Sequence, residues 1–122
     1  MRLTNRELDV IAAVWELGSA TVTEVLERLG EDLAYTTVLT VLRTLEAKGA
    51  VRHRRDGKAY RYTAAISPDD VGERSISRLL DKVFQGSREL LIARLVSGQD
   101  VTPEELERIR KLLDERLREV KS

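Results

Sequence analysis

The sequence of 122 residues contains no cysteine, a single histidine and only 4% aromatic residues. Without cysteine, the chain has no disulfide, no thiolate metal ligand and no cysteine nucleophile. With one histidine as well, we expect neither a transition-metal site nor any other cofactor. No run approaches the roughly 18 apolar residues that a membrane span needs, and the N-terminus lacks the apolar segment of a signal peptide. These absences predict a cytoplasmic protein that does not insert into membranes.

The residue patterns of catalysis are also absent. We find no nucleophile–base pair, no phosphate-binding glycine loop and no converging pair of carboxylates. The acidic residues Glu104, Glu105 and Glu107 are expected at the start of a helix, where acids are favourable, and not at a metal site. The sequence therefore predicts a protein that is not an enzyme.

The formal net charge is zero, but the charge is distributed unevenly along the chain. Residues 1–33 hold three basic and seven acidic side chains, a net charge of −4. Residues 34–63 hold seven basic and two acidic side chains, a net of +5, and residues 64–122 hold 11 and 12, a net of −1. A basic segment confined to one part of the chain is typical of a surface that binds a polyanion such as nucleic acid.

Capping residues and apolar spacing predict three helices in the first half of the chain. The first two each begin with a threonine and a glutamate spaced as a capping box and end at a glycine: Thr4, Glu7 and Gly18, then Thr21, Glu24 and Gly30. A third helix begins near residue 34, without a clear cap, and ends at Gly49. In the first helix the expected buried face consists of Leu8, Ile11, Ala12 and Trp15.

After the third helix the pattern changes from helical to alternating. Residues 50–55 and 58–64 flank Asp56-Gly57, which predicts a β-hairpin whose turn needs positive φ at both central residues. This register sets three pairs opposite each other: Arg55 and Lys58, His53 and Tyr60, Val51 and Tyr62. Three helices followed by a basic hairpin are the order of a winged helix-turn-helix.

The remaining residues predict three more helices, which begin near Ser67-Pro68, Ser87 and Thr102-Pro103. The apolar stripes of the first and last of them have no partner left in the chain, so a second copy is expected to cover them. The expected dimerisation residues are Ile76, Leu79, Leu80, Val83, Phe84, Leu106, Ile109, Leu113 and Leu117. The predicted fold is mainly α with a small β-wing: a winged helix-turn-helix domain over residues 1–66 and a helical dimerisation domain over 67–122.

The third helix is the candidate reader of DNA bases. Small or hydroxyl-bearing side chains let its backbone approach the major groove, where threonine meets a thymine methyl or a phosphate and arginine grips guanine or phosphate. Threonine also fills many exposed helix faces, but four threonines in ten residues oppose helix propensity and favour a binding role. The outward positions are Tyr35, Thr36, Thr37, Thr40, Arg43 and Thr44.

The hairpin is the second candidate DNA contact. Three arginines share one face, Arg52, Arg54 and Arg61, while Arg55 and Lys58 lie at the tip. Such charges are often only solvated. With Asp56 assigned to the turn, however, no acid lies across the strands, and like charges opposite each other destabilise a hairpin unless something neutralises them. DNA phosphates would do so.

These residues resemble the penicillinase-repressor (BlaI/MecI) family of winged helix-turn-helix regulators over nearly the whole chain. The resemblance is carried by residues 3–10 with Trp15, 22–25, 34–45 with Lys48 and Gly49, and 58–62. It implies a homodimeric repressor on a palindromic operator in double-stranded DNA, with each third helix in the major groove and the C-terminal helices of the two chains interlocked. It also implies that the targets are β-lactam-resistance or envelope-stress genes.

The resemblance further implies an inactivating protease that cuts in the C-terminal helical region. This chain departs from the family there, because Arg94-Leu95 stand where some members carry the scissile Asn-Phe pair. Copper-responsive relatives carry C-terminal cysteines, which this chain lacks.

Two other functions remain open on the residues alone. A MarR-like repressor gated by a small molecule is disfavoured by the low aromatic content and by the lack of an obvious apolar pocket. A winged-helix module that binds another protein is disfavoured by the basic segment of residues 34–63. Release of DNA by a saturating ligand would indicate the first, and absence of salt-dependent duplex binding would indicate the second.

Overall fold

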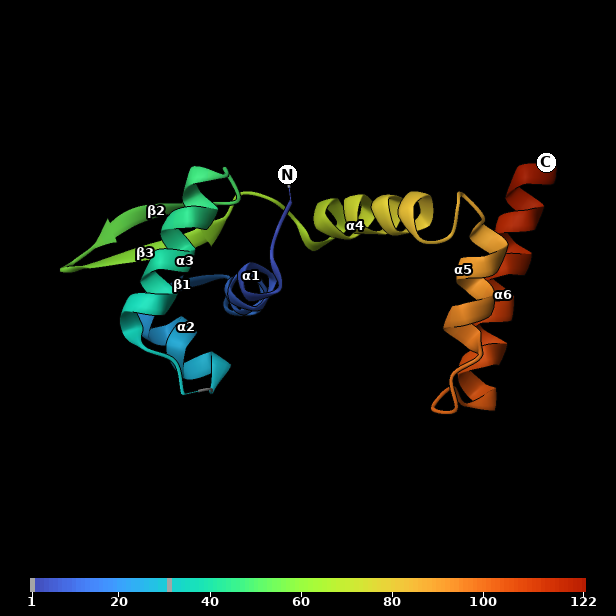
Figure 1. Ribbon diagram of the computed structural model, residues 1–122, viewed down its shortest axis with the longest axis horizontal. Helices are drawn as coiled ribbons and strands as arrows, with labels where there is room; N and C mark the ends of the chain where they lie inside the picture. The colour runs from blue at the N-terminus through green and yellow to red at the C-terminus, as the bar shows by residue number, and fades with distance from the viewer. Residues whose placement is uncertain (1, 31) are drawn as a thin grey trace. The chain divides into compact units, whose positions relative to one another are not determined.

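In a computed structural model that describes residues 2–30 and 32–122, the chain forms six helices and a three-stranded sheet (Figure 1). The elements begin with α1 (Asn5–Leu17), β1 (Ser19–Thr21), α2 (Val22–Leu29), α3 (Tyr35–Ala47), β2 (Val51–Asp56) and β3 (Ala59–Ala64). They continue with α4 (Pro68–Lys82), α5 (Arg88–Val96) and α6 (Pro103–Lys121). The prediction of a mainly α-helical chain with a small β-wing is confirmed.

The chain packs as two compact units, residues 1–74 and 75–122, so the division falls inside α4. The first unit contains α1, α2, α3 and the sheet, and the second contains the end of α4 with α5 and α6. The functional domains expected from the sequence, residues 1–66 and 67–122, stay a prediction.

Both predicted capping boxes are present in the first unit. The hydroxyl of Thr4 accepts from the backbone N–H of Glu7 at 3.1 Å, and the Glu7 carboxylate accepts from the backbone N–H of Thr4 at 2.7 Å. Thr21 and Glu24 make the same two bonds at 3.2 and 2.9 Å. The third helix begins without a side-chain cap, in agreement with the weak signal in the sequence. Local hydrogen bonding therefore fixes where these helices start.

The core of the first unit lies between the three helices and the sheet. Its buried side chains are Val10, Ile11, Ala13, Val14, Ala20, Val22, Val25, Val38, Leu42, Leu45, Ala50, Val51 and Tyr62. The indole N–H of Trp15 donates to the carbonyl oxygen of Ile66 at 2.8 Å and ties α1 to the segment after β3. The prediction that Ala12 is buried is wrong, because α1 packs against both helices and the sheet through the side that carries Val10 and Val14.

The hairpin forms as predicted, but its register is shifted by two residues. The strand order is β1-β3-β2, and the β2–β3 pairs include Asp56 with Ala59, Arg54 with Arg61, His53 with Tyr62 and Val51 with Ala64. Gly57 and Lys58 form the turn, and Gly57 has a φ of 66°. A two-residue turn with glycine first needs positive φ only there, which is why Asp56 can join the strand. A shift of two leaves every side chain on its predicted face.

The second unit buries very little of its apolar surface. Between residues 75 and 122, all of which the structure describes, Leu80 is the one buried residue. Ile76 and Leu79 of α4 are exposed, as are Val83 just after α4 and Leu106, Leu113 and Leu117 of α6. Among the described residues, none of the helices combines the length and the apolar content needed to cross a bilayer.

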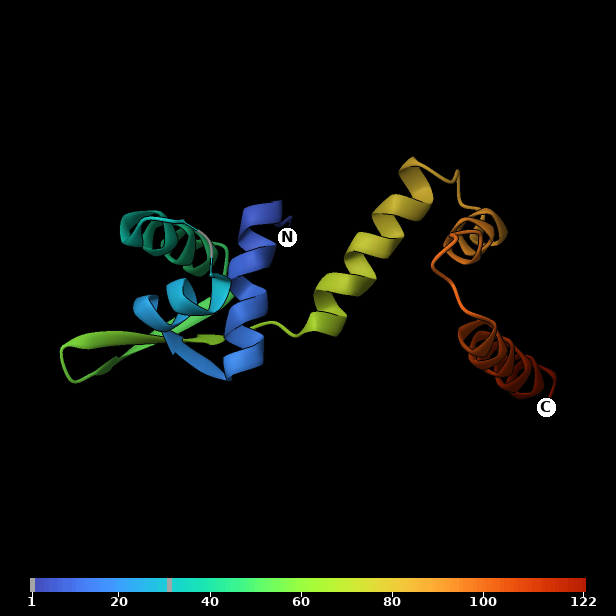
Figure 2. The same cartoon turned by 90° about the horizontal axis from the view of Figure 1, so that it is seen from below.

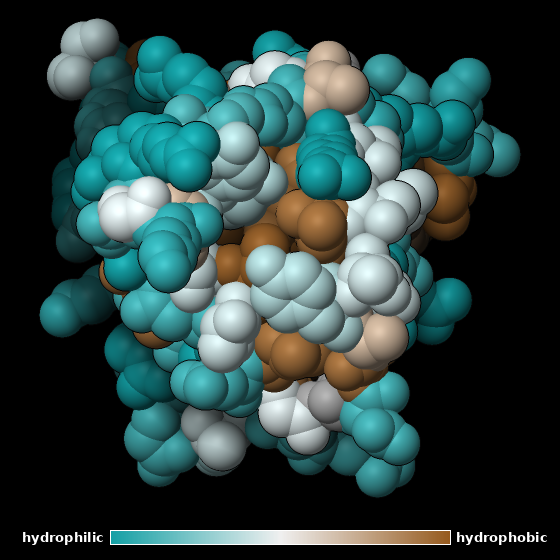
Figure 3. All heavy atoms as spheres, turned by 90° about the vertical axis from the view of Figure 1, so that its left-hand side faces the viewer, coloured by the Kyte–Doolittle hydropathy of each residue, from teal (hydrophilic) through white to brown (hydrophobic). Residues whose placement is uncertain are grey.

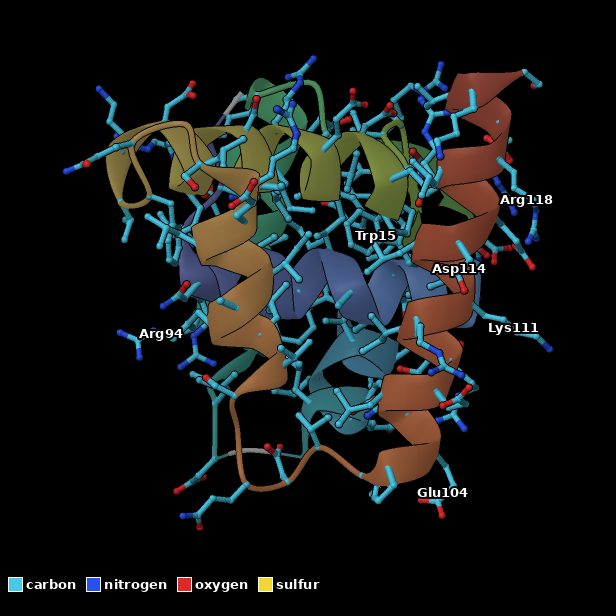
Figure 4. All side chains as sticks on the ribbon, turned by 90° about the vertical axis from the view of Figure 1, so that its right-hand side faces the viewer. Trp15, Arg94, Glu104, Lys111, Asp114 and Arg118 are labelled. Carbon is cyan, nitrogen blue, oxygen red and sulfur yellow. The ribbon has the colours of Figure 1, made fainter. Side chains whose placement is uncertain are left out.

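Polar and apolar residues occupy opposite sides of α6. Figure 4 shows the labelled side chains Glu104, Lys111, Asp114 and Arg118 projecting from one side of the helix. The helical period of 3.6 residues places Leu106, Ile109, Leu113, Leu117 and Val120 on the other side. The last helix is therefore amphipathic, with most of its apolar stripe in solvent.

Candidate nucleic-acid interface

All six outward positions predicted on α3 are exposed: Tyr35, Thr36, Thr37, Thr40, Arg43 and Thr44. The opposite side of the helix is held in the core by Val38, Leu42 and Leu45, so the outward side is fixed by packing. Figure 3 shows the side of the molecule on the left of Figure 1, where hydrophilic side chains surround a smaller apolar area.

Two threonines of α3 use their hydroxyl protons inside the helix. The Thr40 hydroxyl donates to the carbonyl oxygen of Thr36 at 2.8 Å, and the Thr44 hydroxyl donates to that of Thr40 at 3.0 Å. A hydroxyl has a single proton, so these side chains offer an outside partner only acceptor lone pairs and a methyl group. Among the outward side chains of α3, Arg43 is the one that carries a positive charge and several donors.

Four cations of the hairpin are exposed, namely Arg52, Arg54, Arg55 and Lys58. None of them, nor Arg43 of α3, forms an ion pair with a carboxylate of the residues described. The guanidinium of Arg55 lies over the ring of Tyr60, 5.9 Å from its centroid, which orders that side chain. The hairpin extends beyond the helices of its unit, so these charges lie on a projecting element (Figure 2).

Arg61, the fifth predicted hairpin cation, is neutralised by the chain itself. Its Nε donates to Asp56 Oδ2 at 2.9 Å, and its Nη1 donates to Glu24 Oε1 at 2.9 Å. The hydrogen bond between Arg61 and Asp56 lowers the pKa of Asp56 and raises that of Arg61. The backbone hydrogen bond from Thr21, together with the Arg61 charge, lowers the pKa of Glu24.

The prediction that no acid lies across the strands is therefore wrong. It assumed that Asp56 was in the turn, whereas the shifted register places Asp56 in β2, on the same face as Arg61. That face of the hairpin is less basic than its three arginines suggest, because only Arg52 and Arg54 remain without an ion pair among the described residues.

A contact between Glu46 and His53 joins the two candidate elements. The Nδ1 atom of His53 lies 2.7 Å from both carboxylate oxygens of Glu46, which belongs to α3. The imidazole centroid is 4.6 Å from that of Tyr60 and 5.6 Å from that of Tyr62. The sequence placed His53 on the face of these tyrosines but gave no signal for Glu46. The contact holds β2 against the C-terminal half of α3.

A buried carboxylate fixes the same end of α3 to α1. Glu7 is 4% exposed, and its Oε1 accepts from Lys48 Nζ at 2.7 Å. The Lys48 ammonium also donates to the carbonyl oxygen of Arg2 at 2.9 Å. Burial alone would raise the pKa of Glu7, but the hydrogen bonds from Lys48 and Thr4 outweigh it and leave the pKa lowered. The two ends of α3 thus differ, since only the C-terminal end is held by an ion pair among the described residues, that of Lys48 with Glu7.

The predicted dimerisation residues lie on α4, α6 and the loop after α4. Leu80 is buried within the chain, Phe84 and Ile109 are half-buried, and the other six are exposed. Their role in dimerisation stays a prediction. Among the residues that the structure describes, no three His, Asp or Glu side chains gather where they could hold a metal ion.

The chain is similar to known proteins over nearly its whole length. The model of the penicillinase repressor family matches residues 3–115. "Transcriptional regulator BlaI" of Mycobacterium tuberculosis is 34% identical over 118 residues, which cover 93% of this chain and 84% of the relative.

Two solved structures are similar in fold. The Bacillus licheniformis BlaI monomer, solved in complex with the blaP half-operator, aligns with a TM-score of 0.50 and 29% identity over 57% of this chain and 88% of its own. A MarR family protein from Bacillus stearothermophilus aligns with a TM-score of 0.53 over 100% of this chain and 78% of its own. Its identity of 21% shows a shared fold and no more.

Proposed function

Because this chain belongs to the penicillinase repressor family, whose members are transcriptional repressors, we propose that it represses transcription as a homodimer on a two-fold symmetric DNA operator. The observation that carries the proposal is that the first unit contains two exposed elements suited to DNA. One is α3, with six exposed outward residues, and the other is the hairpin, with four cations that no carboxylate of the described residues pairs with. The BlaI relative solved with its half-operator supports the same reading.

In the proposed complex α3 enters the major groove and supplies most of the sequence preference. Arg43 donates to guanine or phosphate, and the methyl groups of Thr40 and Thr44 contact thymine methyls. The wing cations Arg52, Arg54, Arg55 and Lys58 contact phosphates and supply most of the affinity. Tyr35, Thr36 and Thr37, in the first turn of α3, are placed to contact the backbone at the groove edge.

The homodimer is proposed because the second unit leaves its apolar residues in solvent. Leu106, Leu113 and Leu117 are 41%, 50% and 53% exposed and share one side of α6. Exposed apolar stripes on a small chain are costly unless another surface covers them. A second copy carries the same stripe, so a two-fold axis would bury both at once.

The family supports three finer proposals. The targets are β-lactam-resistance or envelope-stress genes, the site of action is the cytoplasm, and a protease is the inactivating partner. The chain offers the exposed residue Leu95, 66% exposed at the end of α5, next to Arg94. A cut in this helical region would separate α6 from the first unit.

The test is selection of genomic duplex fragments by the purified protein, followed by affinity measurements at several salt concentrations. We expect one enriched two-fold symmetric sequence, with half-sites about one helical turn apart. Each phosphate contact releases condensed cations, so log K should fall against log salt with a slope of about −0.9 per contact. Arg54→Ala should flatten that slope, whereas the control Arg118→Ala, on the polar side of α6, should not. Salt-independent binding, or none, would instead favour a protein-interaction module.

A further inference from the structure

We propose that Arg61 is a positioning residue that fixes the direction of the wing, and that it does not bind DNA phosphate. This inference rests on the proposed function, because the direction of the wing matters only where the wing contacts DNA. It reassigns one of the five hairpin cations for which the sequence alone predicts a phosphate contact.

Arg61 connects three separate elements through one guanidinium. Nε donates to Asp56 at the end of β2, and Nη1 donates to Glu24 in the first turn of α2 at 2.9 Å. Nη1 also donates to the carbonyl oxygen of Ser19 in β1 at 3.5 Å. Glu24 uses the same oxygen, Oε1, to accept from the backbone N–H of Thr21, so Arg61 is attached to the capping box of α2.

The carboxylates of Glu24 and Asp56 already neutralise the charge of Arg61, so this arginine offers no unpaired positive charge to a phosphate. One guanidinium lies against two carboxylates, so the cluster of Arg61, Glu24 and Asp56 has a net charge of −1. The Arg61 side chain is only 22% exposed. A phosphate would have to displace a carboxylate from a planar fork whose donors are already aligned.

Arg54 provides the contrast within the same hairpin. It lies directly opposite Arg61 in the register, on the same face, and is exposed. It makes no ion pair or hydrogen bond with any carboxylate of the described residues, although its charge contributes, after that of Arg61, to the lowered pKa of Asp56. Of these two arginines, Arg54 is therefore available to contact DNA, whereas Arg61 is bound to carboxylates of its own chain.

The wing needs such an anchor because a two-stranded ribbon is only marginally stable by itself. Beyond the helices the β2–β3 hairpin has no third strand, since β1 pairs with β3 only from residue 61 to residue 63 (Figure 2). Arg61 holds one face of the hairpin to α2, and the contact of His53 with Glu46 holds the other face to α3. The wing is thus fixed from both faces relative to the helices of its own unit.

Substitution by lysine separates positioning from phosphate binding. Lysine keeps the positive charge but has no fork, so it cannot bond two carboxylates on different elements in the same geometry. A phosphate contact tolerates lysine, because an ammonium also binds phosphate as a point charge. Arg54→Lys is the matched control on the same face.

The binding experiment uses the full chain and the duplex enriched from genomic fragments, with a scrambled duplex for comparison. We expect Arg61→Lys to weaken binding about as much as Arg61→Ala, by roughly tenfold, and Arg54→Lys to stay within about twofold of the wild type. The Arg61→Ala substitution is also made in a background that carries Glu24→Gln and Asp56→Ala. Glutamine keeps an amide oxygen that can accept from the backbone N–H of Thr21, so the cap of α2 is retained. In this background, adding Arg61→Ala should lower the DNA affinity by less than about twofold. Wild-type affinity of Arg61→Lys, or a tenfold loss from Arg61→Ala in that background, would overturn the proposal.

A second measurement on the free protein needs no DNA. Amide hydrogen exchange of residues 54–60 should accelerate in both Arg61→Lys and Arg61→Ala and stay unchanged in Arg54→Lys, because only Arg61 holds the hairpin. Unchanged exchange in both Arg61 variants would refute the anchor even if DNA binding is altered. If the wild type enriches no duplex, the repressor function fails, while the exchange result still decides whether Arg61 anchors the wing.

Discussion

The two units of the chain differ in how far they bury their apolar side chains. Residues 2–30 and 32–74 enclose a core in which Ile11, Val14, Leu42 and Leu45 are fully buried. In residues 75–122 only Leu80 falls below one-tenth exposure, while Leu90, Leu112 and Val120 are more than half exposed. Amphipathic patterning alone does not separate the two units, since both contain amphipathic helices.

The difference shows that the first unit completes its own fold and the second does not. Three helices packed against a sheet cover each other's apolar sides, whereas α5 and α6 each leave apolar residues in solvent. Stability of the first unit should depend on its own packing, and stability of the second on what covers it.

The largest effect is expected from a cavity in the first unit. Leu42→Ala should lower the free energy of unfolding by about 2–5 kcal/mol, because Leu42 is 0% exposed and its neighbours cannot fill the space. Leu112→Ala, at a side chain 65% exposed, is the matched control and should change stability by less than about 0.5 kcal/mol. Thermal and urea unfolding would measure both, and equal losses would show that the two units are packed alike.

The next effect concerns the buried carboxylate at the start of α1. Lys48→Met should cost about 1–3 kcal/mol, because Glu7 loses its charged partner while remaining 4% exposed. The pKa of Glu7 is lower in the folded protein, so the stability from its ionised form is present above its ordinary pKa of 4.5 and is lost as the pH falls toward the folded pKa. Acid titration of stability should therefore be steeper in the wild type than in Lys48→Met, and identical curves would contradict the ion pair.

A smaller effect, of a different kind, is expected in the second unit. Leu113→Ala should weaken self-association by about 1–2 kcal/mol, roughly tenfold in the dissociation constant, because half of this side chain remains to be buried by a partner. Sedimentation equilibrium over a range of concentrations would measure the shift. A chain that stays monomeric at all concentrations would remove the homodimer from the proposed function.

The smallest effect is expected on the polar side of α6. Arg118 projects from the same side of the helix as Glu104, Lys111 and Asp114 and is exposed (Figure 4). Arg118→Ala should change stability by less than about 0.5 kcal/mol and leave self-association unaltered. A loss of dimer comparable with that of Leu113→Ala would mean that the interface lies on the other side of the helix.

Features that depend on near neighbours in the sequence were predictable. The capping boxes at Thr4 and Thr21 follow from residues three positions apart, and the outward side of α3 follows from the helical period. The hairpin register was harder, because Gly57 can serve as the first or the second central residue of a tight turn. The two choices differ by two residues, and the alternating pattern of side chains is identical for both.

Features that depend on distant residues were not predictable from a pattern. Arg61 and Glu24 are 37 positions apart, and only the fold brings the start of α2 beside β3. From the sequence, Arg61 was one of three equivalent arginines on a basic face, and Glu24 was only a helix cap. The same holds for Glu46, which the sequence places simply at the end of a helix.

The order β1-β3-β2 leaves both outer strands with an unpaired edge of backbone N–H and C=O groups. Such edges can add strands from other molecules and start aggregation. Here β1 is only three residues long, and β2 carries Arg52, Arg54 and Arg55 along its length. Two copies approaching edge to edge through β2 would bring these like charges together. The arginines of β2 thus disfavour association of two copies through this edge of the sheet.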